Sequence, residues 1–277
     1  METQSAIPEI DLPSLGAIME AAERDTTNRM PYGLDFASCI RLKGFAVIGA
    51  VFSRAQITSL ASNLTAWIQE NHGDERFNHA GIRISLASCP PARTAALDPT
   101  LLNFVSAILG KGARPVRAIL FDKTPDANWS VGWHQDLTIG VAENLPVPGF
   151  SVWSRKDGIP HVQPPAEILE QMLTARIHFD DCGEANGPLR VHAGSHRSGR
   201  LSPQHIAAWR AKGRETMCTA DAGDILFMRP LLLHASSSST VPAHRRVLHL
   251  EYAACSLPGG LRWNEDPQHP VYSKLVS

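Results

Sequence analysis

The segment LTARIHFDD, residues 173–181, alternates apolar and polar side chains. Successive side chains of a β-strand point to opposite faces of its sheet, so this alternation predicts a strand with one apolar and one polar face. The apolar face carries Leu173, Ala175, Ile177 and Phe179, and the polar face carries Thr174, Arg176, His178 and Asp180. The chain around this segment is therefore expected to form a β-sheet.

Further strand patterns lie on both sides of it. HRRVLHLEYAA (244–254) alternates in the same way, while PVRAILFDK (115–123) and GDILFMRP (223–230) are buried runs. EANGPLRVH (184–192) offers an Asn-Gly turn before a short strand. Many short strands predict a sandwich or barrel.

The first third of the chain reads as mainly helical. SRAQITSLASNLTAWIQENHG (53–73) opens with Ser and Gln at capping-box spacing, and DPTLLNFVSAILG (98–110) has an Asp cap, a Pro at the first helical position and a Gly stop. GFAVIGAVF (44–52) reads as a strand. A mostly-β fold with flanking helices follows.

The chain shows no repeat, low-complexity block or clear boundary, which favours one domain over residues 1–277. We divide it into a mainly helical part (1–112), a β core (113–256) and a C-terminal tail (257–277). Residues 142–172 are rich in Pro and Gly and are expected to contain little regular structure. A loop this long inside a compact domain is often functional, as a lid or binding loop.

Charge and cysteine content narrow the class of protein. The formal net charge of −1 gives no basic field for nucleic acid or an anionic membrane, and the apolar runs are too short to span a bilayer. The N-terminus lacks the pattern of a secretory signal, and the five scattered cysteines have no C-x-x-C. These features predict a cytoplasmic protein with reduced thiols that binds neither nucleic acid nor a membrane; they say nothing of its oligomeric state.

A second stretch, SVGWHQDLTIGV (130–141), places two polar residues in an apolar run. On a strand, His134 and Asp136 share one face and Gln135 points away. Two His and one carboxylate on one face of an octahedron form the site of non-haem Fe(II) oxygenases. The second His must come from elsewhere, and His234, at the end of an apolar segment, is a candidate.

Three motifs together resemble one known family. WHQD (133–136), NGPLRVHAGSHRSGRL (186–201) and AGDILFMRPLLLHASSSSTVPAHRRVLHLEY (222–252) are similar to the phytanoyl-CoA dioxygenase family of Fe(II)/2-oxoglutarate oxygenases. The resemblance begins weakly at residue 44 and runs to about residue 254. It implies a double-stranded β-helix (a jelly-roll, cupin-like core) with flanking helices.

The resemblance also assigns roles to residues. His134, Asp136 and His234 become the iron ligands, and Arg245, eleven positions after His234, becomes the anchor for 2-oxoglutarate, with a hydroxyl from Ser236. A planar guanidinium can hold a carboxylate through two parallel hydrogen bonds.

Arg246 is the competing choice for the anchor, although its strand face carries Leu248, Leu250 and Tyr252 and suits packing better. Lys123 and Asn128 are further candidates for contacts to the cosubstrate, with a surface lysine and a turn asparagine as the alternatives. Candidates for the substrate pocket, each with a purely structural role as the alternative, are Trp153, Lys156, Arg176, His178, Arg190 and His192. His196 and Asp224 read as structural.

The implied activity uses Fe(II), 2-oxoglutarate and O2 to hydroxylate, or otherwise oxidise, an unactivated C–H bond of a small polar metabolite or natural-product intermediate, with release of succinate and CO2. Halogenating relatives replace the carboxylate ligand with a small residue, so Asp136 favours hydroxylation or a related oxidation. The fold does not choose the substrate.

Two alternatives stay open at the level of sequence. A cupin-like or zinc-dependent metalloenzyme could use the same three ligands without 2-oxoglutarate, because catalytic zinc also takes two His and one carboxylate. Arg245 and Ser236 would have no obvious role in such an enzyme. The second alternative is a non-catalytic protein that keeps the metal site for ligand binding.

Overall fold

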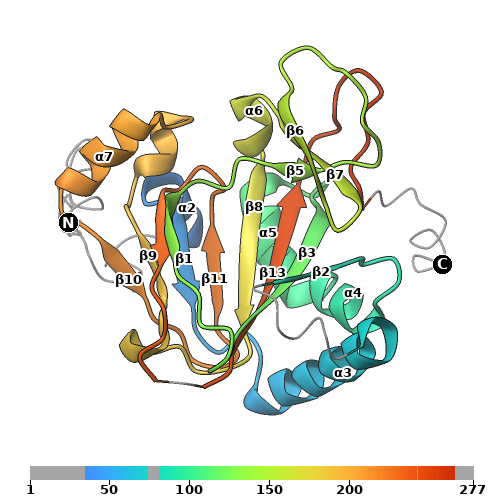
Figure 1. Cartoon of the computed structure of the whole chain (residues 1–277), viewed down its shortest axis with the longest axis vertical. Coiled ribbons are helices and arrows are strands. Elements are labelled where there is room, and N and C mark those ends of the chain that lie inside the picture. Colours follow the sequence, from blue (N-terminus) through green and yellow to red (C-terminus); the bar gives the residue numbers. More distant parts are fainter. Residues whose placement is uncertain (1–34, 74–80, 242, 266–277) are drawn as a thin grey trace, which may run out of the picture.

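The computed structural model describes residues 35–73, 81–241 and 243–265. Its largest sheet has six antiparallel strands in the order β1-β11-β8-β13-β3-β2. Their bounds are β1 Phe45–Ile48, β11 Ile225–Met228, β8 Met172–His178, β13 Arg245–Ala253, β3 Arg114–Lys123 and β2 Ile82–Ile84. A four-stranded sheet in the order β10-β9-β12-β4 comprises Thr216–Cys218, Leu189–Val191, His234–Ser236 and Val131–His134. Figure 1 shows β9 and β10 of this small sheet beside β1 of the large one.

Helices cover the outer face of the large sheet. They are α2 (Phe36–Leu42), α3 (Arg54–His72), α4 (Pro90–Ala96) and α5 (Pro99–Leu109), and Figure 1 shows the last three beside β8, β13 and β3. The strand register brings Ala46, Phe227, Ala175, Leu250 and Ala118 into one row on this face, and all five belong to the main apolar core. Burial of that row against the helices is the main stabilising contribution of this layer.

The opposite face of the large sheet points inward and is polar along its centre. The register pairs Arg176 with His249, and Glu251 with both Thr174 and Arg117. Near β1 this face is apolar instead, and there Phe45 and Met228 pack with Leu189 and Val191 of the small sheet. The two sheets therefore enclose an interior that is apolar at one side and charged at the other.

Both predicted helices are confirmed, together with their caps. The Ser53 hydroxyl accepts the Gln56 N–H at 3.3 Å, and the Gln56 side chain accepts the Ser53 N–H at 2.9 Å before α3. The Asp98 carboxylate accepts two backbone N–H groups at the start of α5. The predicted mostly-β, jelly-roll class is confirmed as well.

The expectation of little regular structure in residues 142–172 is wrong. This region contains β6 (Ser151–Lys156) and β7 (Ile159–Gln163), which join β5 (Ile139–Gly140) in a three-stranded sheet, and then α6 (Ala166–Leu169). The β6–β7 turn is Asp157-Gly158, with φ of 49° and 81°. Asp-Gly supplies the positive φ that a two-residue hairpin turn needs, and the apolar residues of β7 pack in a separate small core.

The remaining described elements are η2 (Glu184–Asn186), η3 (Ser195–Ser198) and α7 (Pro203–Ala211). None of the described helices is long and apolar enough to cross a membrane. None of the five cysteines forms a disulfide. The segment that was read for a secretory signal, and residues 266–277 of the predicted tail, lie outside the described residues.

Candidate metal centre

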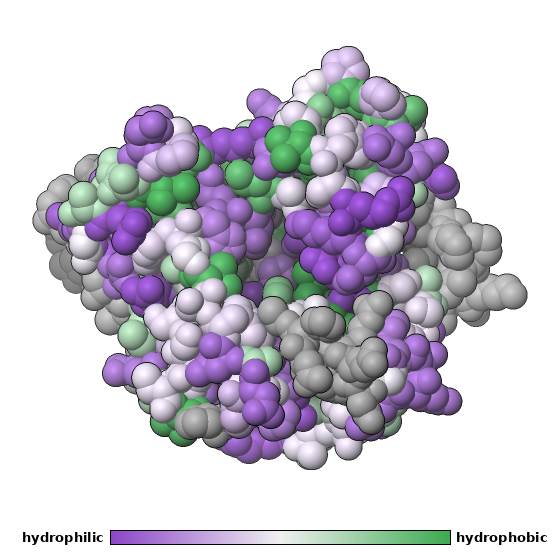
Figure 2. Space-filling view, viewed as in Figure 1, coloured by the Kyte–Doolittle hydropathy of each residue, from purple (hydrophilic) through white to green (hydrophobic). Residues whose placement is uncertain are grey.

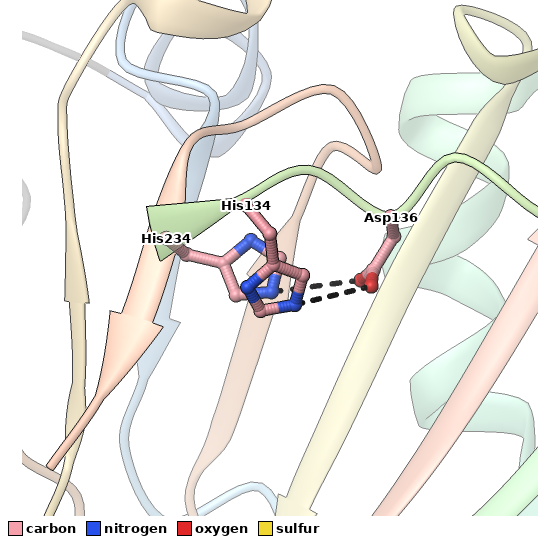
Figure 3. Close-up of side chains that lie close together, drawn as sticks. All are labelled: His134, Asp136 and His234. Atoms are coloured by element: carbon pink, nitrogen blue, oxygen red, sulfur yellow. Dashed lines mark ion pairs between the residues drawn. The ribbon is translucent and has the colours of Figure 1, made fainter. Parts of the chain in front are cut away.

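The three predicted metal ligands come together where β4 meets β12. The two strands pair directly at His134 and His234, and Asp136 follows two residues after the end of β4. The Nε2 atoms of His134 and His234 each lie 3.8 Å from an oxygen of Asp136, and the three ligand atoms lie within 4.8 Å of one another. Figure 3 shows both rings directed towards the carboxylate.

Backbone carbonyls orient both rings. His134 Nδ1 lies 2.8 Å from the Gly132 carbonyl, and His234 Nδ1 lies 2.9 Å from the Leu232 carbonyl. A carbonyl only accepts, so each Nδ1 carries the proton and each Nε2 keeps its lone pair. This is the arrangement by which a second hydrogen bond prepares a histidine to bind a metal ion.

The carboxylate of Asp136 lacks a donor. Its backbone N–H donates to the Pro230 carbonyl at 2.9 Å, but its buried Oδ2 has no hydrogen-bond partner among the described residues. Burial raises the pKa of this carboxyl, while His234, His249 and His134 lower it, and the result is a pKa of about 2. A partly buried carboxylate with one unsatisfied oxygen, facing two imidazole lone pairs, is a ligand set suited to a divalent cation.

Gln135 points the other way, as the strand prediction requires. Its amide donates to the carbonyls of Leu231 and Gly199, and its oxygen accepts the Leu201 N–H at 2.8 Å. The residue between the two ligands thus fixes the ligand strand to the segments before β12 and after η3.

Arg245 and Lys123 form a cationic pair deeper in the interior. They are cross-strand partners on β13 and β3, and their exposed fractions are 4% and 0%. Arg245 donates to the Gly187 carbonyl, and its buried Nε has no partner among the described residues; Lys123 donates to the Ser237 carbonyl. Burial, with Arg245 and Arg176 nearby, lowers the pKa of Lys123 to about 8. Lys123 is therefore no surface lysine, and the pair suits a bound anion.

A tight turn and a neighbouring strand complete this end. Gly187 has φ of 62°, and a Cβ there would collide with the Ser237 carbonyl, so the turn requires glycine. Ser236 is buried on β12 and lies two residues after His234, which places both on the same face.

Arg246 lies on the opposite face of β13. It binds Asp180 through two side-chain hydrogen bonds of 2.7 and 2.9 Å, and its backbone N–H donates to the same carboxylate. Its guanidinium is thus already paired, while the Nε of Arg245 is not.

Three of the six predicted pocket residues, Arg176, His178 and Lys156, lie on or near the inner face. Arg176 donates to His249 Nδ1 at 2.8 Å, and burial, with Arg176 and Arg245, lowers the pKa of His178 to about 3. Lys156 donates to the Thr138 hydroxyl at 3.2 Å. Trp153 packs against the apolar core of the hairpin, which favours a structural role.

Arg190 and His192 are not brought to the metal centre. Arg190 pairs with Ala235, between the inward-facing His234 and Ser236, so it lies on the outer face of the small sheet. There Arg190 binds Glu215 at 2.9 Å, and the His192 ring packs on Trp133 at 4.5 Å. Strand alternation directs these two residues outward, so the structure does not bring them together with the metal ligands.

Asn128 and His196 have structural contacts. The Asn128 amide donates to the Ser239 carbonyl and accepts the Ser239 N–H, both at 2.7 Å, which matches the alternative of a turn asparagine. His196 Nε2 lies 3.1 Å from the Arg41 carbonyl, and Asp224 accepts two backbone N–H groups, in keeping with their structural reading.

Three interior residues were missed. Arg117 donates to Glu251, whose carboxylate also accepts from His249 Nε2 at 3.2 Å, and this network lies on the inner face near Asp136. The signal was present, because alternation along 115–123 puts Arg117 on the same face as Lys123.

Comparison with known proteins agrees with the family resemblance of the sequence motifs. The model of the family described as phytanoyl-CoA dioxygenase (PhyH) matches residues 40–247. No curated protein matches the chain.

Solved structures that share the fold include AviO1, HygX and SnoK. AviO1 from Streptomyces viridochromogenes Tue57 is 22% identical, with a TM-score of 0.57, 83% of this chain and 98% of that chain covered. HygX from Streptomyces hygroscopicus, with nickel and 2-oxoglutarate bound, is 18% identical (TM-score 0.56; 77% and 84% covered). SnoK, a non-haem α-ketoglutarate-dependent carbocyclase from nogalamycin biosynthesis, is 17% identical (TM-score 0.62; 87% and 91% covered). At these identities the likeness concerns the fold.

Proposed function

The chain belongs to the phytanoyl-CoA dioxygenase family of Fe(II)- and 2-oxoglutarate-dependent oxygenases, and from this premise we propose that it oxidises an unactivated C–H bond of a small polar metabolite or natural-product intermediate. Hydroxylation is the outcome we favour, because Asp136 supplies the carboxylate ligand. One observation carries the proposal: the buried pair Arg245 and Lys123 lies in the same interior as the His134–Asp136–His234 cluster.

In this proposal His134, Asp136 and His234 hold Fe(II) from one side. Arg245 binds the distal carboxylate of 2-oxoglutarate, Ser236 adds a hydroxyl donor, and Lys123 adds positive charge. When bound, iron and 2-oxoglutarate supply, with O2, the oxidising power for C–H cleavage, and succinate and CO2 are the coproducts.

The remaining work falls to the chain. Gln135 fixes the ligand strand, and the charged residues on the inner face of β3, β8 and β13 orient a polar substrate. The β6–β7 hairpin is the element we assign to closing the site and excluding water. We further propose that the protein is cytoplasmic and that the chain forms a single domain.

The buried cations separate this proposal from its alternatives. A zinc hydrolase or a metal-dependent binding protein would use the three ligands but leave Arg245 without a partner for its buried Nε. The Arg245 guanidinium donates to the Gly187 carbonyl but makes no ion pair with a described residue, and a buried charge without a counter-ion is costly, so an anionic cosubstrate explains its retention best.

Conversion of 2-oxoglutarate to succinate tests the proposal. We expect the protein loaded with Fe(II) to form succinate only when O2 is present, and zinc-loaded protein to form none. Activity that persists without O2, or with zinc in place of iron, would favour the metallohydrolase alternative. The Asp136→Ala variant should form no succinate, whereas Arg155→Met, at an exposed position outside the site, should behave as the unchanged protein.

A further inference from the structure

The inner face of the large sheet has two cationic ends. Lys123 and Arg245 form one end, and Arg117 is paired with Glu251 six residues further along β13. At about 3.4 Å per residue the two ends lie roughly 20 Å apart. Asp136 lies towards the Arg117 end, because Arg117 donates to the carbonyl of Thr138, two residues after Asp136. A cosubstrate held at Arg245 therefore leaves the Arg117 end free for another molecule.

Two cations meet at Thr138, just two residues beyond Asp136. Arg117 donates to the Thr138 carbonyl at 3.1 Å, and Lys156 donates to the Thr138 hydroxyl at 3.2 Å. One cation comes from β3 of the large sheet and the other from β6 of the hairpin. Both charges are thus positioned close to the candidate metal centre, on the side away from Arg245.

Lys156 is the cation in this group whose charge is not balanced. Arg117 is paired with Glu251, and Arg83 of β2 is paired with Asp157 at 2.8 Å, whereas Lys156 makes no ion pair within the described ranges. Burial, and then Arg117 and Arg83, lower the pKa of Lys156, while the carboxylates of Asp136 and Glu251 raise it. Only one of the three donors of its ammonium group is used, by a neutral hydroxyl.

A β-bulge directs Lys156 inward. Val152 has φ of 51°, and the β6–β7 register shifts between Ser151 and Ser154. Beyond this irregularity, Ser154 and Arg155 are exposed while Lys156 is half-buried. Bulges of this kind re-aim side chains next to functional sites. Figure 2 shows the surface hollowed between the small sheet and the hairpin, with hydrophilic residues on the hairpin side.

We propose that Lys156, supported by Arg117, binds an oxyanion of the substrate, so that the substrate is a small molecule with a carboxylate or phosphate group and is oxidised at a carbon between that group and the metal. A compact ammonium group recognises either oxyanion as a point charge. This inference rests on the proposed function, and it makes the hairpin part of the specificity as well as a cover. It predicts that neutral analogues bind more weakly than the corresponding anions.

The test uses the full chain with Fe(II) and 2-oxoglutarate under anaerobic conditions. The probes are small carboxylic acids and phosphate monoesters, each paired with a neutral partner, the primary amide or the free alcohol. The complex of Fe(II) and 2-oxoglutarate with the protein is followed by its visible charge-transfer band. We expect the compounds of at least one anionic series to perturb this band at concentrations about tenfold or more below those that their neutral partners require. The two series distinguish a carboxylate substrate from a phosphorylated one.

Variants of the hairpin complete the test. Lys156→Met should bring acid and amide to within about threefold of each other, Lys156→Arg should retain most of the preference, and Arg155→Met should leave it unchanged. The inference is overturned if the band forms but no anion perturbs it, if neutral partners bind equally well, or if Lys156→Met keeps the preference. Failure of the band to form in the unchanged protein would instead reject the proposed function, and this inference with it.

Discussion

At the scale of single residues, Arg245 and Arg246 show how alternation divides identical side chains between two tasks. The first faces the interior beside Lys123, and the second is paired with Asp180 on the other face. We predict that Arg245→Met weakens 2-oxoglutarate binding by at least about tenfold, because a charge-assisted contact is lost. Arg246→Met should lower stability but leave that affinity within about twofold.

Anaerobic calorimetric titration of 2-oxoglutarate into the Fe(II)-loaded protein measures both effects. Equal affinities for the unchanged protein and Arg245→Met would show that the anchor lies elsewhere. A loss confined to Arg246→Met would exchange the two assignments.

His178 gives a pH dependence at the same scale. Burial, with Arg176 and Arg245, lowers its pKa to about 3, from 6.5 for an exposed histidine. The unfolded chain therefore binds the proton first as the pH falls, so this contribution to stability is complete above pH 6.5 and is lost progressively towards pH 3. We expect a loss of roughly 2 kcal/mol between pH 7 and pH 5.

Urea unfolding at pH 7, 6 and 5 measures this loss. The His178→Gln variant, which has no imidazole to protonate, should show a shallower decline over the same range. Parallel declines in both proteins would mean that other groups cause the acid sensitivity.

At the scale of elements, the turn before β9 links backbone conformation to the cosubstrate end. Gly187 has positive φ, a Cβ there would strike the Ser237 carbonyl, and its own carbonyl accepts from Arg245. Gly187→Ala should lower the free energy of unfolding by about 2 kcal/mol or more, because of backbone strain and the collision with Ser237, and it should also weaken 2-oxoglutarate binding.

Gly213→Ala is a matched control. Gly213 has nearly the same φ, 65°, but nothing lies within 4 Å of a Cβ built there. This variant should cost about 1 kcal/mol in chemical denaturation and leave cosubstrate affinity unchanged. Equal losses of stability and equal cosubstrate affinities in the two variants would show that the close approach of Gly187 to Ser237 is not important.

Elements with a clear local signal could be predicted. The N-cap and stop signals located α3 and α5, and alternation along 173–181 assigned the two faces of β8 correctly. The β6–β7 hairpin was missed because Pro and Gly content was weighted above the Asp157-Gly158 turn signal. Strand alternation alone does not say which face of β9 points to the interior, so the outward position of Arg190 could not be predicted from the sequence.

At the scale of the whole molecule, the order of strands decides which residues meet. The spacing of His134 and Asp136 is local, and their meeting with His234 was implied by family resemblance and agrees with the pairing of β4 and β12. The network of Arg117, His249 and Glu251 depends on β3 and β13 being neighbours. The order of the strands cannot be read from sequence alternation. Alternation therefore predicts the sheet face of each of these residues but not that they contact one another.

Ligand linkage gives a prediction for the entire fold. Fe(II) and 2-oxoglutarate bind the folded chain through residues of β3, β4, β12 and β13, so they should stabilise it as a unit. At one hundred times its dissociation constant a ligand adds about 2.7 kcal/mol to the free energy of unfolding. Anaerobic thermal unfolding should show this increase, a chelator should reverse it, and Asp136→Ala should show little of it. An unfolding temperature that does not change when metal and cosubstrate are added would contradict the proposed sites.

The most direct test of the central claim is the anaerobic visible spectrum of the protein with Fe(II) and 2-oxoglutarate. The account predicts the charge-transfer band of 2-oxoglutarate bound to iron in the unchanged protein, and no such band in His234→Ala, which lacks one of the three ligands. A protein that binds Fe(II) tightly but shows no band with saturating 2-oxoglutarate would contradict it.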